Sequence, residues 1–439
     1  MTQITRAEVF DVRFPTSLEL DGSDAMHVDA DYSAAYVVLH TDSDICGYGM
    51  TFTIGRGNEL CVSAAERIAE RLIGWDIEDM VDDMGPIYRH AKSDHQLRWL
   101  GPDKGVVHLA LAAVMNAVWD LVARLENLPV WELLATMTPA QLVRASDFTY
   151  ITGAITPAEA LELLEKQVPT REFRIRQLQS SGYPCYTTSP GWLGYSDEKM
   201  LASAQRAVDA GFQHIKLKVG ANLQDDRRRC ALVRDLIGPA RHLMIDANQM
   251  WDVDQAIEWT NSLAEFNPLW VEEPTAPDDA LGHATISRAV APAGVATGEH
   301  AHNRVLFKQL FQARAIDFAQ IDACRLGGIN EILPVLFMAA KFGVPVCPHA
   351  GGVGLCELVQ HLSFFDFIAV SGTREDRVIE YVEHLHEHFT DPVNIVNASY
   401  RPTGQPGYSA RMKPRSVQTY SYPDGTYWIS QLKGAAVGI

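Results

Sequence analysis

The feature that most constrains the fold is a regular alternation of short apolar segments with helix-length segments, from Pro184 to about residue 380. Each apolar segment has the length of a strand, and the chain between two of them is long enough for one helix. Eight strands are predicted: Cys185–Ser189, His214–Val219, His242–Asp246, Trp270–Glu272, Val295–Gly298, Phe318–Asp322, Pro345–Pro348 and Val378–Tyr381. Eight strands joined by helices predict an α/β fold built on a (β/α)8 barrel of the TIM type, at 184–392.

The chain before the barrel has a different pattern, with strands first and helices afterwards. Ala7–Phe14, Ala34–Leu39 and Gly47–Phe52 are predicted strands, and Asn58–Ile73 and Val106–Arg124 show helical apolar spacing. Residues 1–140 are therefore predicted to form an α+β capping domain, followed by a connector at 141–183. The tail at 393–439 is rich in Pro, Gly, Ser and Tyr, and we expect it to return to the capping domain and complete it.

Composition excludes several classes of function. The formal net charge of −18 argues against nucleic acid or an anionic membrane surface as a partner. The seven cysteines form no CxxC motif, which favours reduced thiols in a cytoplasmic protein. The N-terminus has no apolar signal segment, and no run of about 18 apolar residues occurs, so we expect neither secretion nor a membrane span.

Polar residues recur at the ends of consecutive predicted strands. The chain places Lys216, Lys218, Asp246, Asn248, Glu272, Glu299, Asp322, His349 and Glu380 there. Counted once per strand, from Lys218 through Asp246 to Glu380, they recur in steps of 23 to 31 residues. One acid at such a position is more typical of a helix N-cap or of the surface. A series of such residues, one at the end of each successive strand, instead indicates an active site, because the carboxyl ends of barrel strands surround one mouth.

Lys216 and Lys218 lie two residues apart in an alternating strand and therefore point to the same face of the sheet. A KLK segment alone is more typical of an amphipathic edge strand with solvated lysines. In a site, each ammonium would disfavour the charge of the other, and one of them could act as a neutral base near pH 7.

Three carboxylates, Asp246, Glu272 and Glu299, would repel one another at this mouth unless a cation bound there. Their donor atoms are all oxygen and no cysteine lies in phase with them, which favours Mg2+ over zinc. His349 lies on the other side, where Asp322 can orient its imidazole. A metal between two bases suits removal of a proton α to a carboxylate, followed either by reprotonation, as in a racemase or epimerase, or by loss of a β-hydroxyl, as in a dehydratase.

Taken together, KLK at 216–218, DAN at 246–248, VEEP at 271–274, GEH at 298–300, Asp322 and His349 resemble the enolase superfamily, in its mandelate-racemase subgroup. The resemblance covers nearly the whole chain and implies an enolase-like barrel. The segments GSDAMH, from Gly22, and IEYVEHLHEHF, from Ile379, are similar to those of acid-sugar dehydratases acting on L-fuconate. His300 departs from the commoner GEN pattern.

The resemblance implies a role for each candidate residue. Asp246, Glu272 and Glu299 would bind Mg2+, and Lys218 would remove the C2 proton. Lys216 would contact the substrate carboxylate and lower the pKa of Lys218, and Glu380 would hydrogen-bond the same carboxylate. His349, held by Asp322, would protonate the leaving 3-hydroxyl, giving a 2-keto-3-deoxy acid. The expected substrate contacts also include Asn248 and, from capping loops over the polyol end, Gly22, Ser23, Asp24 and Tyr32.

Three hypotheses stay open at this point: a Mg2+-dependent dehydratase of L-fuconate or another acid sugar, a racemase or epimerase on the same scaffold, and a non-catalytic binding relative. The intact set of mutually repelling groups counts against the third. His384, His386 and His388 suggest a metal site, but their position after the last strand favours a polar helix start. A small acid sugar is the expected partner, and a homo-oligomer is a further expectation.

Overall fold

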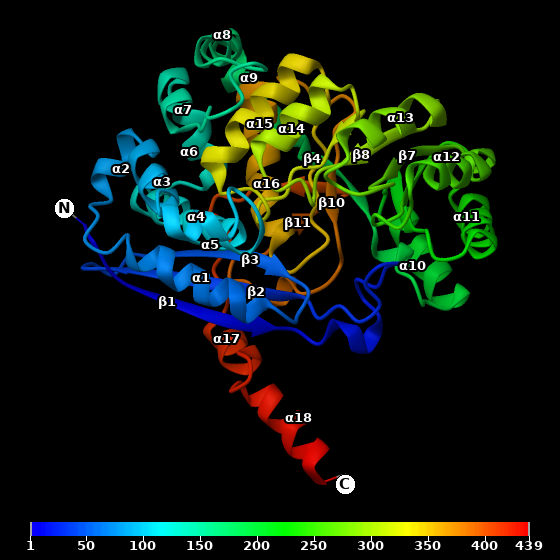
Figure 1. Cartoon of the computed structure of the whole chain (residues 1–439), viewed down its shortest axis with the longest axis horizontal. Coiled ribbons are helices and arrows are strands. Elements are labelled where there is room, and N and C mark those ends of the chain that lie inside the picture. Colours follow the sequence, from blue (N-terminus) through cyan, green and yellow to red (C-terminus); the bar gives the residue numbers. More distant parts are fainter. Residues whose placement is uncertain (1, 438–439) are drawn as a thin grey trace.

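The computed structural model describes residues 2–437 and shows a small capping sheet beside a barrel (Figure 1). The sheet contains β1 (Ile4–Arg13), β2 (Ser33–Thr41) and β3 (Cys46–Thr53), antiparallel and in that order. Helices α1 (Asn58–Glu70) and α5 (Gly105–Leu125) cover one face of it. The short helices α2 (Glu78–Asp82), α3 (Gly85–Lys92) and α4 (His95–Leu100) lie between them in sequence.

Helix α5 is the core of the capping domain. Within the described part of the chain, it is the one helix long and apolar enough to cross a membrane, but 83% of its most apolar stretch is buried inside the protein. The helix packs between the capping sheet and the barrel, so its apolar surface is used in the core.

The segment predicted as a connector is largely helical. After α6 (Val130–Thr136) it holds α7 (Pro139–Ala145), α8 (Pro157–Gln167) and α9 (Arg171–Ser181). Helix α8 begins with the capping box expected from its sequence, in which Thr156 and Glu159 each bond the other's backbone N–H. In α9, Arg171 and Arg174 are buried and donate to main-chain carbonyl groups, including those of Met137 and Ile368.

The barrel strands confirm the predicted fold class. The parallel strands are β4 (Tyr183–Thr187), β5 (His214–Lys218), β6 (His242–Asp246), β7 (Pro268–Glu272), β8 (Gly294–Thr297), β9 (Phe318–Ala319) and β10 (Ile379–Tyr381), and β10 pairs with β4. The predicted strand Pro345–Pro348 is reduced to one bridge between Val346 and Ala319. Prolines on both sides of that bridge have no N–H to donate, which limits the ladder there.

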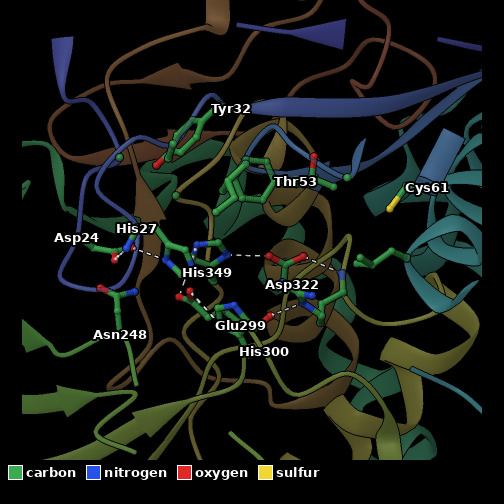
Figure 2. Close-up of a pocket in the computed structure, with 18 of the residues that line it drawn as sticks. Asp24, His27, Tyr32, Thr53, Cys61, Asn248, Glu299, His300, Asp322 and His349 are labelled. Carbon is green, nitrogen blue, oxygen red and sulfur yellow. Dashed lines mark hydrogen bonds and ion pairs between the residues drawn. The ribbon is translucent and has the colours of Figure 1, made fainter. Parts of the chain in front are cut away.

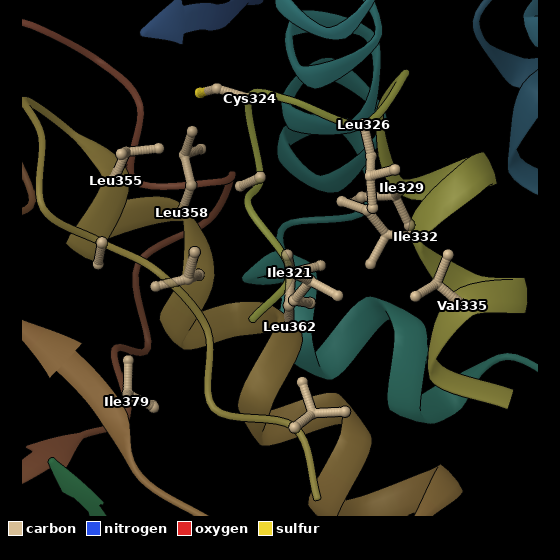
Figure 3. Packing of buried hydrophobic residues seen from close by; sticks show 14 of the residues in the cluster. Ile321, Cys324, Leu326, Ile329, Ile332, Val335, Leu355, Leu358, Leu362 and Ile379 are labelled. Carbon is tan, nitrogen blue, oxygen red and sulfur yellow. The ribbon is translucent and has the colours of Figure 1, made fainter. Parts of the chain in front are cut away.

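Helices surround the barrel: α10 (Asp197–Asp209), α11 (Leu223–Ile237), α12 (Val253–Ser262), α13 (Ala280–Val290), α14 (Arg304–Gln312), α15 (Ile329–Phe342) and α16 (Leu355–Phe365). Figure 3 shows Ile329, Ile332 and Leu358 of α15 and α16 in the apolar layer beside Ile321, which follows β9. A separate buried cluster, formed by Tyr186, Met244, Trp270, Ala296, Cys347 and Val378, comes from the strands and their ends. These layers hold the strand ends rigidly.

The tail contacts both parts of the molecule. Strands β11 (Asn394–Ile395) and β12 (Ser399–Arg401) extend the barrel sheet, because β12 pairs antiparallel with β4. The chain then reaches the capping sheet, where Met412 N–H donates to the Tyr36 hydroxyl at 3.1 Å and Tyr422 N–H to the Asp11 carbonyl at 2.7 Å. Helix α17 (Pro414–Tyr420) contacts β1, and α18 (Thr426–Val437) projects away from the body (Figure 1).

Candidate active site

Three carboxylates from three successive strands meet at the carboxyl end of the barrel. Asp246 ends β6, Glu272 ends β7 and Glu299 follows β8, and they offer oxygen atoms within 4.8 Å of one another, all from buried residues. Gly298 permits this turn, because a Cβ there would lie 2.3 Å from the Gln320 carbonyl oxygen. The positions predicted from sequence spacing therefore converge in space.

The electrostatics of this cluster favour a bound cation. Burial and the charge of Asp246 raise the pKa of Glu272 well above its ordinary value, and burial and Glu273 raise that of Glu299. Glu299 Oε2 is buried and has no hydrogen-bond partner among the described residues. A compact set of three buried carboxylates, with oxygen donors only, fits Mg2+.

The two lysines of β5 point to the same side, as predicted. Lys218 Nζ lies 2.6 Å from Asp246 Oδ2, whereas Lys216 Nζ lies 2.5 Å from Glu272 Oε1 and 3.0 Å from Glu380 Oε1. Lys216 is fully buried beneath the carboxylates and does not line the cavity above them. This arrangement gives Lys216 a positioning role toward Glu272 and Glu380, in place of the expected contact with a substrate carboxylate.

Lys216 lowers the pKa of Lys218, as expected, but the net shift of that pKa is upward. Burial and the neighbouring Lys216 ammonium do disfavour the charged form, but the Asp246 carboxylate at 2.6 Å outweighs both and raises the pKa. Spacing along the strand predicted the repulsion between the lysines. It did not predict which carboxylate would pair with Lys218.

His349 and Asp322 form a tight pair, with Nδ1 2.7 Å from Oδ2. Asp322 is fixed in turn by the N–H groups of Cys324 and Arg325, both donating to Oδ1. Burial disfavours the imidazolium, but the charges of Glu299 and the bond from Asp322 prevail and raise the pKa of His349 to about 10. His349 Nε2 lies 3.6 Å from Glu299 Oε2, so the imidazolium faces the metal-binding carboxylates.

Glu380, in β10, lies between the lysine and the histidine. Its Oε1 accepts hydrogen bonds from the Thr188 hydroxyl and Lys216, and its Oε2 accepts the Ala350 N–H at 2.8 Å. Burial opposes ionisation, but Lys216 and His349 lower the pKa of Glu380 to about 2. Thr188 was missed by sequence reasoning because it is not charged, although it lies within the predicted strand Cys185–Ser189.

A cavity of about 310 Å3 lies above these groups, between barrel and capping domain. In the view of Figure 2, Asp24, His27 and Asn248 gather on one side, Cys61 lies on the other, and His349 and Glu299 lie between. The predicted residues that line it are Gly22, Asp24, Tyr32, Lys218, Asn248, Glu299, Asp322, His349 and Glu380. Ser23 is buried in the loop and does not line it, and Lys216, Asp246 and Glu272 lie beneath its floor.

Tyr32 is held from three directions. Its ring stacks on His384 with centroids 5.5 Å apart and meets the edge of Phe52 at 5.1 Å. A Cβ on Gly22, which has φ of +85°, would lie 2.4 Å from the Tyr32 hydroxyl. Only glycine fits this turn without displacing the tyrosine.

The three histidines after β10 have separate partners. His384 stacks on Tyr32, His386 Nδ1 lies 2.7 Å from Glu357 Oε1, and His388 Nδ1 lies 3.0 Å from the Ser416 hydroxyl. They form no metal-binding group among the described residues. His386 and His388 lie in a three-residue 3-10 helix that does not continue, and His384 precedes it, so the expected helix start is met only in part.

His300, the departure from the common motif, lies next to the third carboxylate. Its Nδ1 is 2.8 Å from Glu273 Oε1 and 3.5 Å from Glu299 Oε1. Glu273, Glu299 and His300 are close enough to bind a cation, but His300 and Glu273 already form an ion pair, and Gln249 also donates to Glu273. His300 therefore packs beside the candidate metal ligand Glu299, in a hydrogen-bonded group with Glu273 and Gln249.

Sequence reasoning also missed His27, Trp192 and Arg325, which line the cavity. His27 lay within a motif used for the resemblance but had no assigned role. Trp192 follows the first strand, and its ring centre lies 5.6 Å from Lys218 Nζ. Because loop residues follow no sequence period, the sequence alone does not predict that a loop tryptophan will line the cavity.

Two family models match the chain. One, described as enolase C-terminal domain-like, matches residues 199–416, and the mandelate racemase/muconate lactonizing enzyme N-terminal domain matches residues 9–135. Human mitochondrial enolase superfamily member 1 is 57% identical over 97% of each chain, and its crystal structure superposes with a TM-score of 0.96, covering 98% of both chains.

Two dehydratases are also similar. L-galactonate dehydratase from Hypocrea jecorina is 52% identical, over 95% of this chain and 94% of its own. L-talarate/galactarate dehydratase from Salmonella typhimurium LT2, solved with Mg and L-lyxarohydroxamate, is 25% identical with a TM-score of 0.74, covering 96% of this chain and 93% of its own.

Proposed function

The chain belongs to the mandelate racemase/muconate lactonizing enzyme family of the enolase superfamily, and on that premise we propose that it dehydrates L-fuconate to 2-keto-3-deoxy-L-fuconate. It is an acid-sugar dehydratase, that is, a hydro-lyase, and it uses Mg2+. One observation carries the proposed mechanism: Lys218 and the Asp322-supported His349 line the same cavity beside the three-carboxylate cluster.

Asp246, Glu272 and Glu299 would hold the metal. When bound, Mg2+ supplies positive charge that stabilises a developing enediolate and offsets the pull of Asp246 on the Lys218 proton. Lys218 is the proposed base for the C2 proton in its neutral amine form, since its side chain lines the cavity and Trp192 covers Nζ. Lys216 stays charged beneath and balances Glu272 and Glu380.

His349 is the proposed acid. Its raised pKa keeps the imidazole protonated near pH 7, and its Nδ1–H is engaged by Asp322, which leaves Nε2–H for the departing 3-hydroxyl. A hydrogen bond from Glu380 to a substrate carboxylate requires the protonated acid. Because the pKa of Glu380 is lowered, this role depends on like-charge repulsion from the arriving carboxylate to raise that pKa.

The cavity wall supports L-fuconate as the substrate. Phe52, Ile54, Leu60, Val106 and Leu109 give the capping side an apolar surface, which suits the terminal methyl group of a 6-deoxy sugar acid. Of the two motifs resembling L-fuconate dehydratases, GSDAMH lies on the capping loop that lines the same cavity, and IEYVEHLHEHF contributes Glu380 from β10. The same wall also carries Arg56, so the comparison of substrates includes galactarate, a dicarboxylic acid.

L-galactonate is the second candidate, because a relative named for that activity is 52% identical. It differs from L-fuconate only by a hydroxyl on C6. A hydrophobic pocket discriminates weakly against an added hydroxyl, by a factor of about 100.

The test is a comparison of substrates. We expect Mg2+-dependent formation of a 2-keto-3-deoxy acid from L-fuconate, with a higher kcat/KM than for L-galactonate or galactarate. A higher kcat/KM for L-galactonate would move the assignment to the second candidate. Exchange at C2 without loss of water from any of the three acids would indicate a racemase or epimerase.

A further inference from the structure

The loop that closes the cavity carries an aspartate–histidine pair, Asp24 and His27. Asp24 Oδ1 accepts the N–H groups of Met26 at 2.7 Å and of His27 at 2.6 Å. The Asp24 N–H donates back to the His27 carbonyl at 2.9 Å. Asp24 is 7% exposed, so these bonds lock the loop into one tight turn.

The same aspartate orients the imidazole. Asp24 Oδ2 lies 3.2 Å from His27 Nδ1, and because a carboxylate only accepts, the proton of a neutral ring is held on Nδ1. Nε2 is then left with a lone pair. In the described part of the chain, no group hydrogen-bonds Nε2, although His27 lines the cavity with a side chain only 32% exposed.

The barrel fixes where this histidine lies. Leu193 N–H donates to the Ser23 carbonyl at 2.9 Å, Lys199 Nζ to the Glu19 carbonyl at 2.9 Å, and the Tyr195 hydroxyl to the Asp21 carboxylate. Trp192, in the same barrel segment, covers Lys218. The position of His27 relative to the proposed base is therefore set by direct contacts between the two domains.

We propose that His27, oriented by Asp24, accepts a hydrogen bond from a substrate hydroxyl beyond C3 and thereby determines specificity for longer polyhydroxy acids. The inference rests on the proposed function, in which the carboxylate, C2 and C3 lie at the barrel floor. The rest of the sugar chain then extends toward the capping loop, where Nε2 is free to accept a hydrogen bond. An acid that ends at C4 and carries no hydroxyl beyond C3 cannot make this bond and forgoes its contribution to binding.

The experiment compares a long and a short acid on the same Mg2+-loaded enzyme. It measures KM and kcat for L-fuconate, and the Ki of 2,3-dihydroxybutanoate, matched in configuration at C2 and C3, as a competitor. In His27→Phe we expect KM for L-fuconate to rise about 10- to 100-fold while the Ki of the short acid changes less than about threefold. His27→Asn, which keeps a polar group, should recover most of the loss.

Met26→Leu is the control, since it alters the neighbouring, partly exposed residue of the same turn and should leave both constants unchanged. Equal losses for both acids in His27→Phe would show that the pair only shapes the loop and would overturn the inference. Unchanged constants would also overturn it, as would failure of His27→Asn to recover binding. If the wild-type enzyme dehydrates none of the acids, the proposed function itself is wrong. This outcome distinguishes failure of the proposed function from failure of the inference about His27.

Discussion

At the scale of single residues, neighbouring groups of the same type have different tasks. Lys216 and Lys218 share one strand face, yet Lys216 is wholly buried among carboxylates while Lys218 lines the cavity. His349 and His27 each pair with an aspartate, but His349 faces the metal-binding carboxylates, whereas His27 lines the cavity from the capping loop. Local partners, more than residue type, therefore decide the chemistry.

Asp322 is predicted to set the working pH range of His349. It helps to raise the pKa of His349, so Asp322→Asn should lower that pKa and deprotonate the acid at lower pH. The basic limb of the kcat–pH profile should move to lower pH, and kcat at pH 8 should fall by about 100-fold or more. An unchanged basic limb would contradict the assignment of His349 as the acid.

At the scale of elements, the site depends on loops that leave the carboxyl ends of the strands and on the capping loop opposite. The turn at Gly22 is one of the tight contacts in this set, because its Cβ position is occupied by Tyr32. Ordinary side chains are strained at a φ of +85°, so substitution affects both backbone and packing.

Gly22→Ala should therefore displace the capping loop. We expect KM for the acid sugar to rise about tenfold, with a smaller change in kcat, because the loop contacts substrate and not the reacting carbons. Steady-state kinetics measure the split. Gly74→Ala is the matched control, since Gly74 has φ of +89° but open space around its Cβ position, and it should leave KM unchanged.

The residues at the strand ends were predictable from sequence, because one polar residue recurs in each βα unit. The barrel brings the equivalent position of every unit to one mouth. Asp246, Glu272 and Glu299 met as expected for this reason. Trp192 was not predictable, since loops carry no such period, and Thr188, within the predicted strand Cys185–Ser189, was missed because it is uncharged. The complete burial of Lys216 was not predicted either. Strand alternation gives the face to which a side chain points and not how far it lies from the mouth of the barrel.

At the scale of the whole molecule, a buried ionic network joins the two domains. Glu331 of α15 accepts from His108 of α5 at 2.5 Å and from Arg304 of α14 at 2.7 Å. Arg304 also contacts Asp103 and Asp147. This network anchors the capping helices to the barrel and so keeps the cavity assembled.

Glu331→Gln should destabilise the protein by about 3–5 kcal/mol, because it leaves the buried Arg304 guanidinium with one carboxylate partner fewer. His108 and Arg304 lower the pKa of Glu331 despite burial, so its contribution is complete above the ordinary carboxyl pKa and is lost on acidification. Urea unfolding at pH 7 and pH 4 measures both effects, and the difference between wild type and variant should shrink at pH 4. Glu162→Gln, in an exposed pair with Lys166, should cost less than about 1 kcal/mol.

The central claim is that Lys218 removes the C2 proton and His349 expels the hydroxyl, and proton exchange at C2 tests it most directly. L-fuconate, Mg2+ and D2O are followed by NMR with wild type, Lys218→Met and His349→Asn. The account predicts product from wild type, C2 deuteration without product from His349→Asn, and neither from Lys218→Met, with all reactions stopped by EDTA. Product or deuteration by Lys218→Met at the wild-type rate would contradict it.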